Sequence, residues 1–286
     1  MSALFRDATV MGVLNATPDS FSDGGHLVDA RGLHLARGID LAARLVAEGA
    51  DVLDVGGEST RPGAREVPAD RECARVVPLI EALAKRFATP LSVDTRKAAV
   101  AEAALGAGAV VVNDVSGLRF DPALADATAR AGAVLVLGHC RGTPETMQRT
   151  PHYDAVVAEV AAELRASVAA ARGAGMPEDH LVIDPGIGFG KRPEDNHALL
   201  VGIGALRAAV GGALPVLVGP SRKSFLGHLT GDAAAARDVA TVAACAIAFY
   251  EGADAVRVHD VAGAVRARAV ARALRASRPH TSEGAA

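Results

Sequence analysis

Short apolar runs alternate along the chain with longer stretches in which Ala, Leu and Val recur at helical spacing. The apolar runs lack the polar–apolar alternation of half-exposed strands, so they are typical of parallel strands covered on both faces. We predict strands at residues 9–14, 51–56, 90–95, 109–114, 133–138, 181–185, 215–219 and 254–259. We predict helices between them at residues 33–48, 69–87, 97–107, 122–131, 155–174, 194–209, 235–251 and 264–276.

Eight strands that alternate with eight helices predict a (β/α)8 barrel, the TIM barrel of the α/β class. A doubly wound open sheet uses the same units and is the alternative. Polar residues follow nearly every predicted strand, which favours the barrel, because an open sheet gathers its ligand-binding groups at one crevice. No Ser/Gly-rich or Pro-rich linker divides the chain, so we expect one domain over residues 1–276 and a frayed polar tail at 277–286.

Composition and charge narrow the functional class. Half of the 286 residues are apolar, which is enough for a large buried core. The net charge is −3 with no block of Lys or Arg, so no nucleic-acid-binding surface is indicated. The three cysteines form no C-x-x-C pair, which favours reduced thiols over disulfides or a cysteine zinc site. Without signal-peptide features or an apolar run near the ~18 residues of a membrane span, we expect a cytoplasmic enzyme with no membrane partner.

The first two predicted strands each lead into a polar, Gly-rich loop. The first strand is followed by Asn15 and a loop that is a candidate mobile lid, with a plain surface turn as the alternative. Asp54 lies inside the second apolar run, where an unpaired carboxylate would be costly, so it needs a partner from ligand or protein. We count Asp54 among the candidate substrate-binding residues. Thr60 and Arg61 in the second loop form a candidate clamp for an anion.

Three further strands end in a carboxylate or an amide, namely Asp94, Asn113 and Asp184. Any one of them could simply cap the helix that follows. A barrel would bring all three around one mouth, where their acceptors and donors could read a flat heterocycle rich in N–H groups. A buried acceptor left without its donor costs about 1–3 kcal/mol, so such a ring would discriminate well between ligands.

The last two strands add positive charge. Arg257 and His259 are two residues apart in the last strand and therefore point to the same face. With Asn15 on the adjoining first strand they could form an anion pocket, and phosphate sites near the last two strands recur in this fold. Two adjacent cations, one of them Lys223, follow the seventh strand. The Gly-rich run at 186–191 has the spacing of neither a dinucleotide fingerprint nor a P-loop.

On these residues the chain resembles the dihydropteroate synthases, pterin-binding enzymes of the folate pathway. The matching motifs include Asp-Val-Gly-Gly-Glu-Ser-Thr-Arg-Pro-Gly-Ala at 54–64 and Asp-Pro-Gly-Ile-Gly-Phe-Gly-Lys at 184–191. The other matching stretches are 11–25, 92–95, 112–117, 221–227 and 257–261, so the resemblance covers most of the chain. Several of these motifs are long and specific, and chance is a poor explanation for them.

The resemblance implies a reaction that joins 6-hydroxymethyl-7,8-dihydropterin diphosphate to p-aminobenzoate and releases pyrophosphate, with Mg²⁺ as cofactor. It implies that Asn15 ligates the Mg²⁺ on the diphosphate, and that Arg257 and His259 bind this diphosphate. By the family pattern, the residues that hold the pterin are Asp94, Asn113, Asp184 and Lys223.

The same resemblance places the aminobenzoate beneath the first two loops once they close. Its surroundings would be Phe21, Thr60, Arg61, Pro62, Phe189 and Ser221. Asp23 would help to organise the closed lid, and we assign catalytic roles to Asp23, Arg61, Lys223 and Arg257. If the C–O bond breaks first, positive charge develops on the pterin methylene while a polyanion departs, so the enzyme would act by electrostatics without a covalent intermediate. Closed loops would exclude water, which could otherwise trap the cation.

The resemblance further implies a homodimer and competition between sulfonamides and aminobenzoate. Two other functions stay open. One is a pterin-binding methyltransferase, which the anion-binding residues oppose, and the other is a catalytically silent pterin-binding paralogue. The sequence departs from the family pattern at Gly138 and Cys140, where the family commonly has Met-His-Met. Since those residues normally help to floor the pterin pocket, we expect altered packing there.

Overall fold

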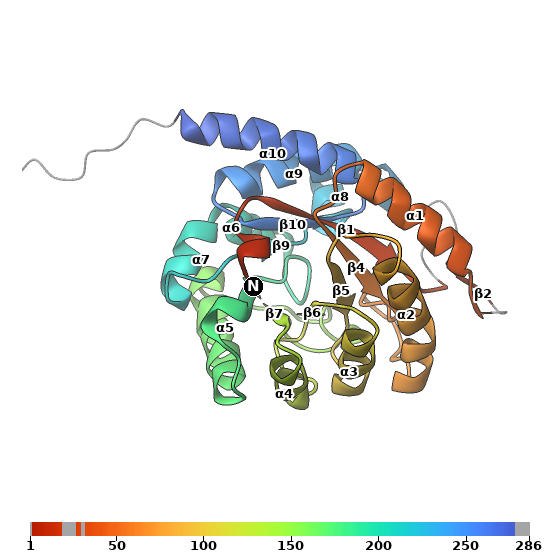
Figure 1. Ribbon diagram of the computed structural model, residues 1–286. Coiled ribbons are helices and arrows are strands. Elements are labelled where there is room, and N and C mark those ends of the chain that lie inside the picture. The colour runs from red at the N-terminus through yellow and green to blue at the C-terminus, as the bar shows by residue number, and fades with distance from the viewer. Residues whose placement is uncertain (1, 19–26, 30–31, 278–286) are drawn as a thin grey trace, which may run out of the picture.

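The computed structural model, which describes residues 2–18, 27–29 and 32–277, has a ring of parallel strands at its centre and helices around it (Figure 1). The sheet contains eight strands in the order β8-β7-β6-β5-β4-β1-β10-β9. A parallel bridge between Ile183 and Val216 joins the two outer strands and closes the ring. The strands are β1 (Thr9–Asn15), β4 (Val52–Gly56), β5 (Leu91–Asp94), β6 (Val111–Asp114), β7 (Val134–Gly138), β8 (Leu181–Asp184), β9 (Leu217–Val218) and β10 (Ala255–Val258).

Helices follow the strands and cover the outside of the ring (Figure 1). They are α1 (Leu35–Ala47), α2 (Ala69–Ala84), α3 (Ala98–Gly106), α4 (Ala123–Arg130), α5 (Val156–Gly173), α6 (Pro193–Val201), α7 (Ile203–Val210), α8 (Ser224–Thr230), α9 (Asp238–Tyr250) and α10 (Val261–Ala276). Three 3₁₀ turns, Ser2–Phe5, Glu178–His180 and Ala234–Ala236, and a small hairpin of β2 (Val28–Asp29) and β3 (Gly32–Leu33) complete the described elements. No helix in the described part of the chain has the length and apolar character needed to span a bilayer.

Alternation along each strand divides the apolar residues into two cores. In β4, Leu53 and Val55 pack outward against the helices, whereas Val52 belongs to a separate cluster inside the ring. Phe5, from the N-terminal 3₁₀ turn, is fully buried in the same inner cluster. The inner apolar residues lie in the N-terminal halves of the strands, so Phe5 closes that end. The polar residues are left for the opposite end, where the strands finish.

The barrel predicted from the sequence is confirmed, and all eight strands lie within the predicted ranges or one residue beyond them. The single helix predicted at 194–209 is wrong, because Gly202 separates α6 from α7. The short helix α8 was not predicted. The predicted tail at 277–286 lies outside the described residues apart from Ser277.

The departure from the family pattern at Gly138 has a steric reason. Gly138 is the last residue of β7, and a Cβ atom at this position would lie 2.7 Å from the Cα of Val115 and 2.8 Å from the carbonyl oxygen of Asp114. The backbone after β6 therefore occupies the space into which a side chain at position 138 would project. The altered packing expected here consists of main chain against main chain.

Replacing Gly138 by the methionine of the family pattern should destabilise the protein. We expect Gly138→Met to lower the free energy of unfolding by about 1–3 kcal/mol, the usual cost of overpacking, measured by urea denaturation. Gly106→Ala is the control, because no heavy atom lies within 4 Å of a Cβ placed there at the end of α3. The control should be neutral or slightly stabilising. A Gly138→Met protein as stable as wild type would contradict the close packing.

Candidate active site

The carboxyl ends of neighbouring strands are level with one another and form a polar rim. Asp94 on β5 pairs in register with Asn113 on β6 and with Gly56 on β4. Asp184 on β8 pairs with Gly138 on β7. The predicted ring of Asp94, Asn113 and Asp184 is thus brought to one end of the barrel, as parallel strands in register require.

Arg257 joins two carboxylates at the centre of this rim. From β10, its Nε donates to Asp54 Oδ2 over 2.5 Å and its Nη2 donates to Asp94 Oδ2 over 2.7 Å. Asn113 Nδ2 also donates to Asp54 Oδ2, at 3.1 Å. Asp54 is fully buried, and its other oxygen, Oδ1, has no hydrogen-bond partner among the described residues. The protein therefore supplies the partners that Oδ2 of Asp54 required, and Oδ1 is left as an acceptor for a donor on a ligand.

Burial controls the protonation of the acidic residues at the rim. It raises the pKa of Asp94 to about 7 although Arg257 lies beside it, and the neighbouring Asp54 carboxylate adds to the rise. Burial also raises the pKa of Asp184, against the attraction of Lys223. Asp94 can therefore exist in either protonation state near neutral pH, which lets it accept or donate a hydrogen bond.

Lys223 stands beside Asp184 on the turn that follows β9. Its Nζ donates to the carbonyl oxygen of Ile187 and lies 4.2 Å from the centre of the Phe189 ring. Burial lowers the pKa of Lys223 to about 8, while Asp184 opposes the shift. The preceding Arg222 has φ 56° and is held by an ion pair of 2.6 Å with Asp238 on α9, which fixes the turn.

His259, Ser221 and Asn15 form the other side of the rim. Ser221 Oγ lies 2.8 Å from His259 Nδ1, and Asn15 Nδ2 lies 3.3 Å from His259 Nε2. Burial lowers the pKa of His259 to about 3, with further lowering by the charges of Arg222 and Arg257. The imidazole is therefore neutral at physiological pH and serves the site through hydrogen bonds. His259 and Asn15, which were expected to form an anion pocket with Arg257, do meet at one rim, and Ser221, expected near the aminobenzoate, lies beside them.

The loop after β4 is anchored by a buried ionic network that the sequence reasoning missed. Glu58 accepts a hydrogen bond of 2.6 Å from Lys97 Nζ and lies 3.2 Å from Arg96 Nη2. Lys97 Nζ also donates to Glu72 of α2, at 2.6 Å. All four side chains are at least nine-tenths buried. The signal in the sequence was a run of charged residues, Arg96 and Lys97, directly after a buried strand.

Beyond this anchor, the same loop carries the predicted residues Thr60, Arg61 and Pro62. Thr60 is half-buried and lines a cavity with Phe189, whereas Arg61 and Pro62 are exposed. The charge of Arg61 reaches His259, since it contributes to the low pKa of that imidazole. The loop is thus placed over the rim and the cavity.

Two predicted residues, Phe21 and Asp23, lie outside the described residues. Within the described part of the chain there is no group of three or more His, Cys, Asp or Glu side chains that could hold a metal ion. The described carboxylates of the rim are directed to Arg257 or lie near Lys223, so a metal would have to be held with the help of a bound substrate.

The sequence matches the family model described as pterin binding enzyme over residues 11–259. The chain belongs to the pterin-binding enzyme family. Among its relatives in this family is the dihydropteroate synthase of Synechocystis sp., 42% identical over 250 residues, which are 87% of this chain and 84% of the relative.

Solved structures of pterin-binding enzymes share the fold and the sequence. A Yersinia pestis dihydropteroate synthase in a sulfonamide drug complex is 41% identical, with a TM-score of 0.88 and 96% of each chain covered. A Xanthomonas albilineans dihydropteroate synthase with 4-aminobenzoic acid is 44% identical, with a TM-score of 0.85 over 96% of this chain and 95% of the other.

Asp94 should make the stability of this pterin-binding enzyme depend on pH. Its pKa of about 7 in the folded protein lies above that of an exposed aspartate, near 3.9, so folding favours the protonated form. Its contribution to stability is then fully present below about pH 4 and is lost as the pH rises through about 7. Asp94→Asn cannot lose a proton, so its free energy of unfolding should rise relative to wild type across this window.

Urea denaturation at several pH values checks this expectation. The exposed residue Asp126 on α4 supplies the control, and Asp126→Asn should show little relative change over the same range. A difference between wild type and Asp94→Asn that stays constant from pH 4 to pH 7.5 would contradict the raised pKa of Asp94.

Proposed function

We propose that this protein is a dihydropteroate synthase, which joins 6-hydroxymethyl-7,8-dihydropterin diphosphate to p-aminobenzoate and releases pyrophosphate in folate biosynthesis. The observation that carries the proposal is the rim, where buried acidic and amide groups lie beside Lys223 and Arg257. Family membership and the likeness to dihydropteroate synthases support it.

The pterin would bind edge-on to the acidic side of the rim. A flat heterocycle with several N–H donors matches Asp94, Asp184 and Oδ1 of Asp54, an atom that no described residue hydrogen-bonds. Asn113 can donate and accept, and the Lys223 ammonium can donate to a ring acceptor. A ligand without these donors would leave buried acceptors unpaired, at a cost of about 1–3 kcal/mol each.

The reaction needs charge stabilisation more than covalent chemistry. As the C–O bond to the diphosphate breaks, positive charge on the pterin methylene would be favoured by the ionised carboxylates of the rim. The departing polyanion would be received by Arg61, whose charge lowers the pKa of His259, and by the hydroxyl of Ser221, which the imidazole of His259 holds in place. The arrangement supplies preorganised charges of both signs on the two sides of the bond that breaks.

Mg²⁺ fits this site only together with the substrate. The described residues offer the amide of Asn15 at the rim, and no cluster of three carboxylate, thiolate or imidazole ligands in the described ranges competes for the ion. Mg²⁺ commonly keeps several waters and binds through one or two protein groups plus substrate phosphates. When bound it would supply positive charge next to the leaving group, and Asn15 would be its protein ligand.

The aminobenzoate would occupy the space under the loop that carries Thr60. The cavity that Thr60 and Phe189 line is also lined by Phe120, Cys140 and Pro144. The backbone N–H of Gly63 donates to the carbonyl oxygen of Pro144, at 2.9 Å, so the loop is tied across the mouth of this cavity. A covered, largely apolar cavity would keep water from the reacting methylene. Sulfonamides, as analogues of aminobenzoate, would compete for the same space.

Purified protein should form dihydropteroate from the two substrates only when Mg²⁺ is supplied, measured by release of pyrophosphate and by detection of the product. Asn15→Ala should raise the Mg²⁺ concentration needed for half-maximal rate by about ten-fold or more, because the ion loses its protein ligand. Asp126→Asn is the control, because Asp126 is exposed on α4 and the variant should need the same Mg²⁺ concentration as wild type. Pterin binding without turnover would instead identify a catalytically silent paralogue.

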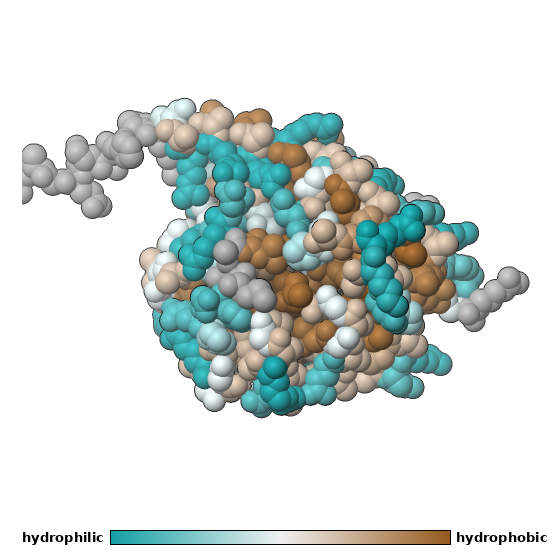
Figure 2. Space-filling model, in the orientation of Figure 1, coloured by the Kyte–Doolittle hydropathy of each residue, from teal (hydrophilic) through white to brown (hydrophobic). Residues whose placement is uncertain are grey.

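We also propose that the protein is a cytoplasmic homodimer. The described cysteines, Cys73, Cys140 and Cys245, are free thiols, which suits a reducing compartment. Apolar side chains are exposed on α9, where Val239 is 83% and Ile247 45% exposed, and Figure 2 shows apolar residues among polar ones at the surface along the adjacent helix α10. On α10, two further apolar side chains are exposed. Such a patch favours association with a second copy.

Light scattering after gel filtration checks the dimer. The double variant Val239→Glu and Ile247→Glu should place charge in the apolar contact and give a monomer. Leu35→Glu, on α1, is the control, because Leu35 is an exposed apolar residue away from α9 and should leave the mass unchanged (Figure 1). A wild-type mass of one chain would contradict the dimer, and so would a double variant that keeps the mass of two.

A further inference from the structure

The Gly-rich run after β8 ends in a buried lysine for which the proposed reaction has no direct use. Lys191 is only 3% exposed. Its Nζ lies 2.9 Å from His139 Nδ1, 3.0 Å from the carbonyl oxygen of Phe189 and 3.4 Å from that of His139. All three partners are uncharged. Burial lowers the pKa of Lys191 to about 7, and none of these three partners is a carboxylate, so hydrogen bonds and not charge pairing hold the amino group in place.

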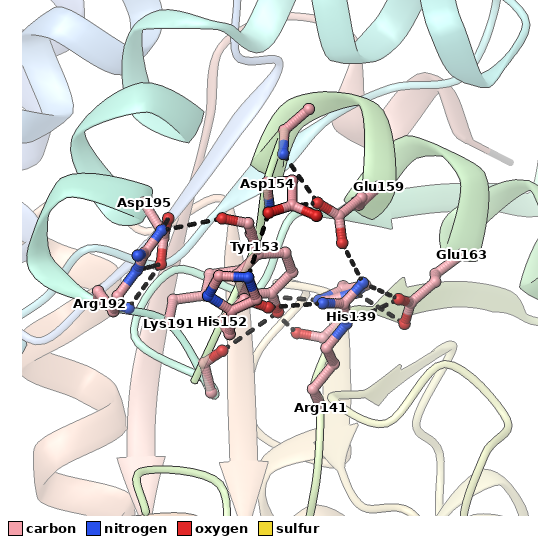
Figure 3. Close-up of polar contacts among 12 residues, drawn as sticks. His139, Arg141, His152, Tyr153, Asp154, Glu159, Glu163, Lys191, Arg192 and Asp195 are labelled. Carbon is pink, nitrogen blue, oxygen red and sulfur yellow. Dashed lines mark hydrogen bonds and ion pairs between the residues drawn. The ribbon is translucent and has the colours of Figure 1, made fainter. Parts of the chain in front are cut away.

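His139 links Lys191 to Glu163 on helix α5. Its Nδ1 accepts from Lys191, so its Nε2 carries the proton and donates to Glu163 Oε2, at 3.1 Å. Glu163 Oε1 in turn accepts from Arg141 Nε at 2.8 Å. Figure 3 shows the imidazole between the lysine on one side and the glutamate on the other. Burial lowers the pKa of His139 to about 4, which keeps the imidazole neutral and able to accept from Lys191.

The run that precedes Lys191 packs directly on the backbone after β7. A Cβ at Gly186 would lie 1.8 Å from the carbonyl oxygen of His139, and a Cβ at Gly190 would lie 2.5 Å from that of Arg141. Both glycines have positive φ, 67° and 61°. Lys191 binds carbonyl oxygens on both sides of this contact, since Phe189 belongs to the run and His139 to the strand end. Its amino group therefore joins the Gly-rich run to the segment after β7, whose backbones lie too close for side chains to fit between them.

The same run touches the reactive side of the site through two of its residues. The carbonyl oxygen of Ile187 accepts from Lys223 Nζ, and the ring of Phe189 lies against that same ammonium. Phe189 also lines the cavity proposed for the aminobenzoate. A displacement of the run would therefore move a wall of that cavity and one anchor of Lys223 together.

We propose that Lys191 is a positioning residue, whose amino group ties Phe189 to His139 and so sets the place of the Phe189 ring and of Lys223. Lys191 itself is buried and does not line the cavity proposed for the aminobenzoate. Its partner His139 is oriented by Glu163, so the support extends from α5 to the pterin site. The kinetic test of this inference rests on the proposed function, because it needs an active enzyme. Pterin binding tests the inference independently, because it needs no turnover.

The first test is Lys191→Met, which keeps the length of the side chain and removes its donors. We expect the KM for aminobenzoate to rise by about ten-fold, with kcat reduced by less than about three-fold, because the wall is displaced while the reacting groups remain. A lysine with a purely structural role would lower the yield of folded protein and leave KM unchanged. Arg192→Gln is the matched control, since the neighbouring Arg192 is held by Asp195 and makes none of these contacts. Its KM should equal that of wild type.

Lys191→Gln keeps an N–H donor on a shorter side chain. It tests the positioning role of Lys191 if Lys191→Met does not fold. We expect a smaller rise in KM for Lys191→Gln, of about three-fold or more. Folded variants with both the KM for aminobenzoate and the pterin dissociation constant of wild type would overturn the proposal.

Calorimetric titration with 6-hydroxymethylpterin separates this inference from the proposed function. The dissociation constant should rise by about ten-fold in Lys191→Met, because Lys223 loses its fixed partner Ile187. If wild type binds the pterin without turnover and Lys191→Met binds it more weakly, the proposed function fails and the positioning role stands. An unchanged dissociation constant together with an unchanged KM would overturn the positioning role alone.

Discussion

The contact of Arg257 with Asp54 and Asp94 is the interaction on which the polar rim of the barrel depends. Both carboxylates are buried at the ends of neighbouring strands, and an unpaired buried charge costs several kcal/mol. One guanidinium from β10 reaches both of them and leaves Oδ1 of Asp54 as an acceptor without a partner in the described chain. Arg257 therefore both compensates the buried charge of the two carboxylates and orients them toward a ligand.

Around this centre, three loops that bear substrate-binding candidates rest on buried or half-buried polar supports. Glu58 and Lys97 hold the loop of Thr60, and Asp238 holds the turn of Lys223 through Arg222. Lys191 holds the run of Phe189. None of these supports needs to meet a substrate, yet each fixes the backbone next to a residue for which we propose such a contact. Loops with such anchors at their bases can present side chains with the accuracy that charge stabilisation requires.

Much of this could be predicted from sequence, because strand patterning and the polar strand ends are local signals. Uninterrupted apolar runs predicted all eight strands, and Asp54 inside such a run correctly indicated a buried acid with a partner. The choice of Arg257 as that partner was not predictable, since it depends on closure of the ring between residues 203 positions apart. His139, Glu163 and Lys191 were missed for the same reason. Helix α8 was missed because a seven-residue helix beside a functional loop has too short a pattern.

The wall between Asn113 and Asp184 differs in kind from the one the family pattern describes. Where a methionine is common, this chain has Gly138, and main chain from Asp114 and Val115 fills the space. Thioether side chains change rotamer easily and mould themselves to ligands of different outline. Peptide groups in a closed barrel cannot do so. Inhibitors that rely on contact with a flexible methionine side chain would meet a rigid backbone surface here. Their affinity would depend on how well their own shape fits that surface.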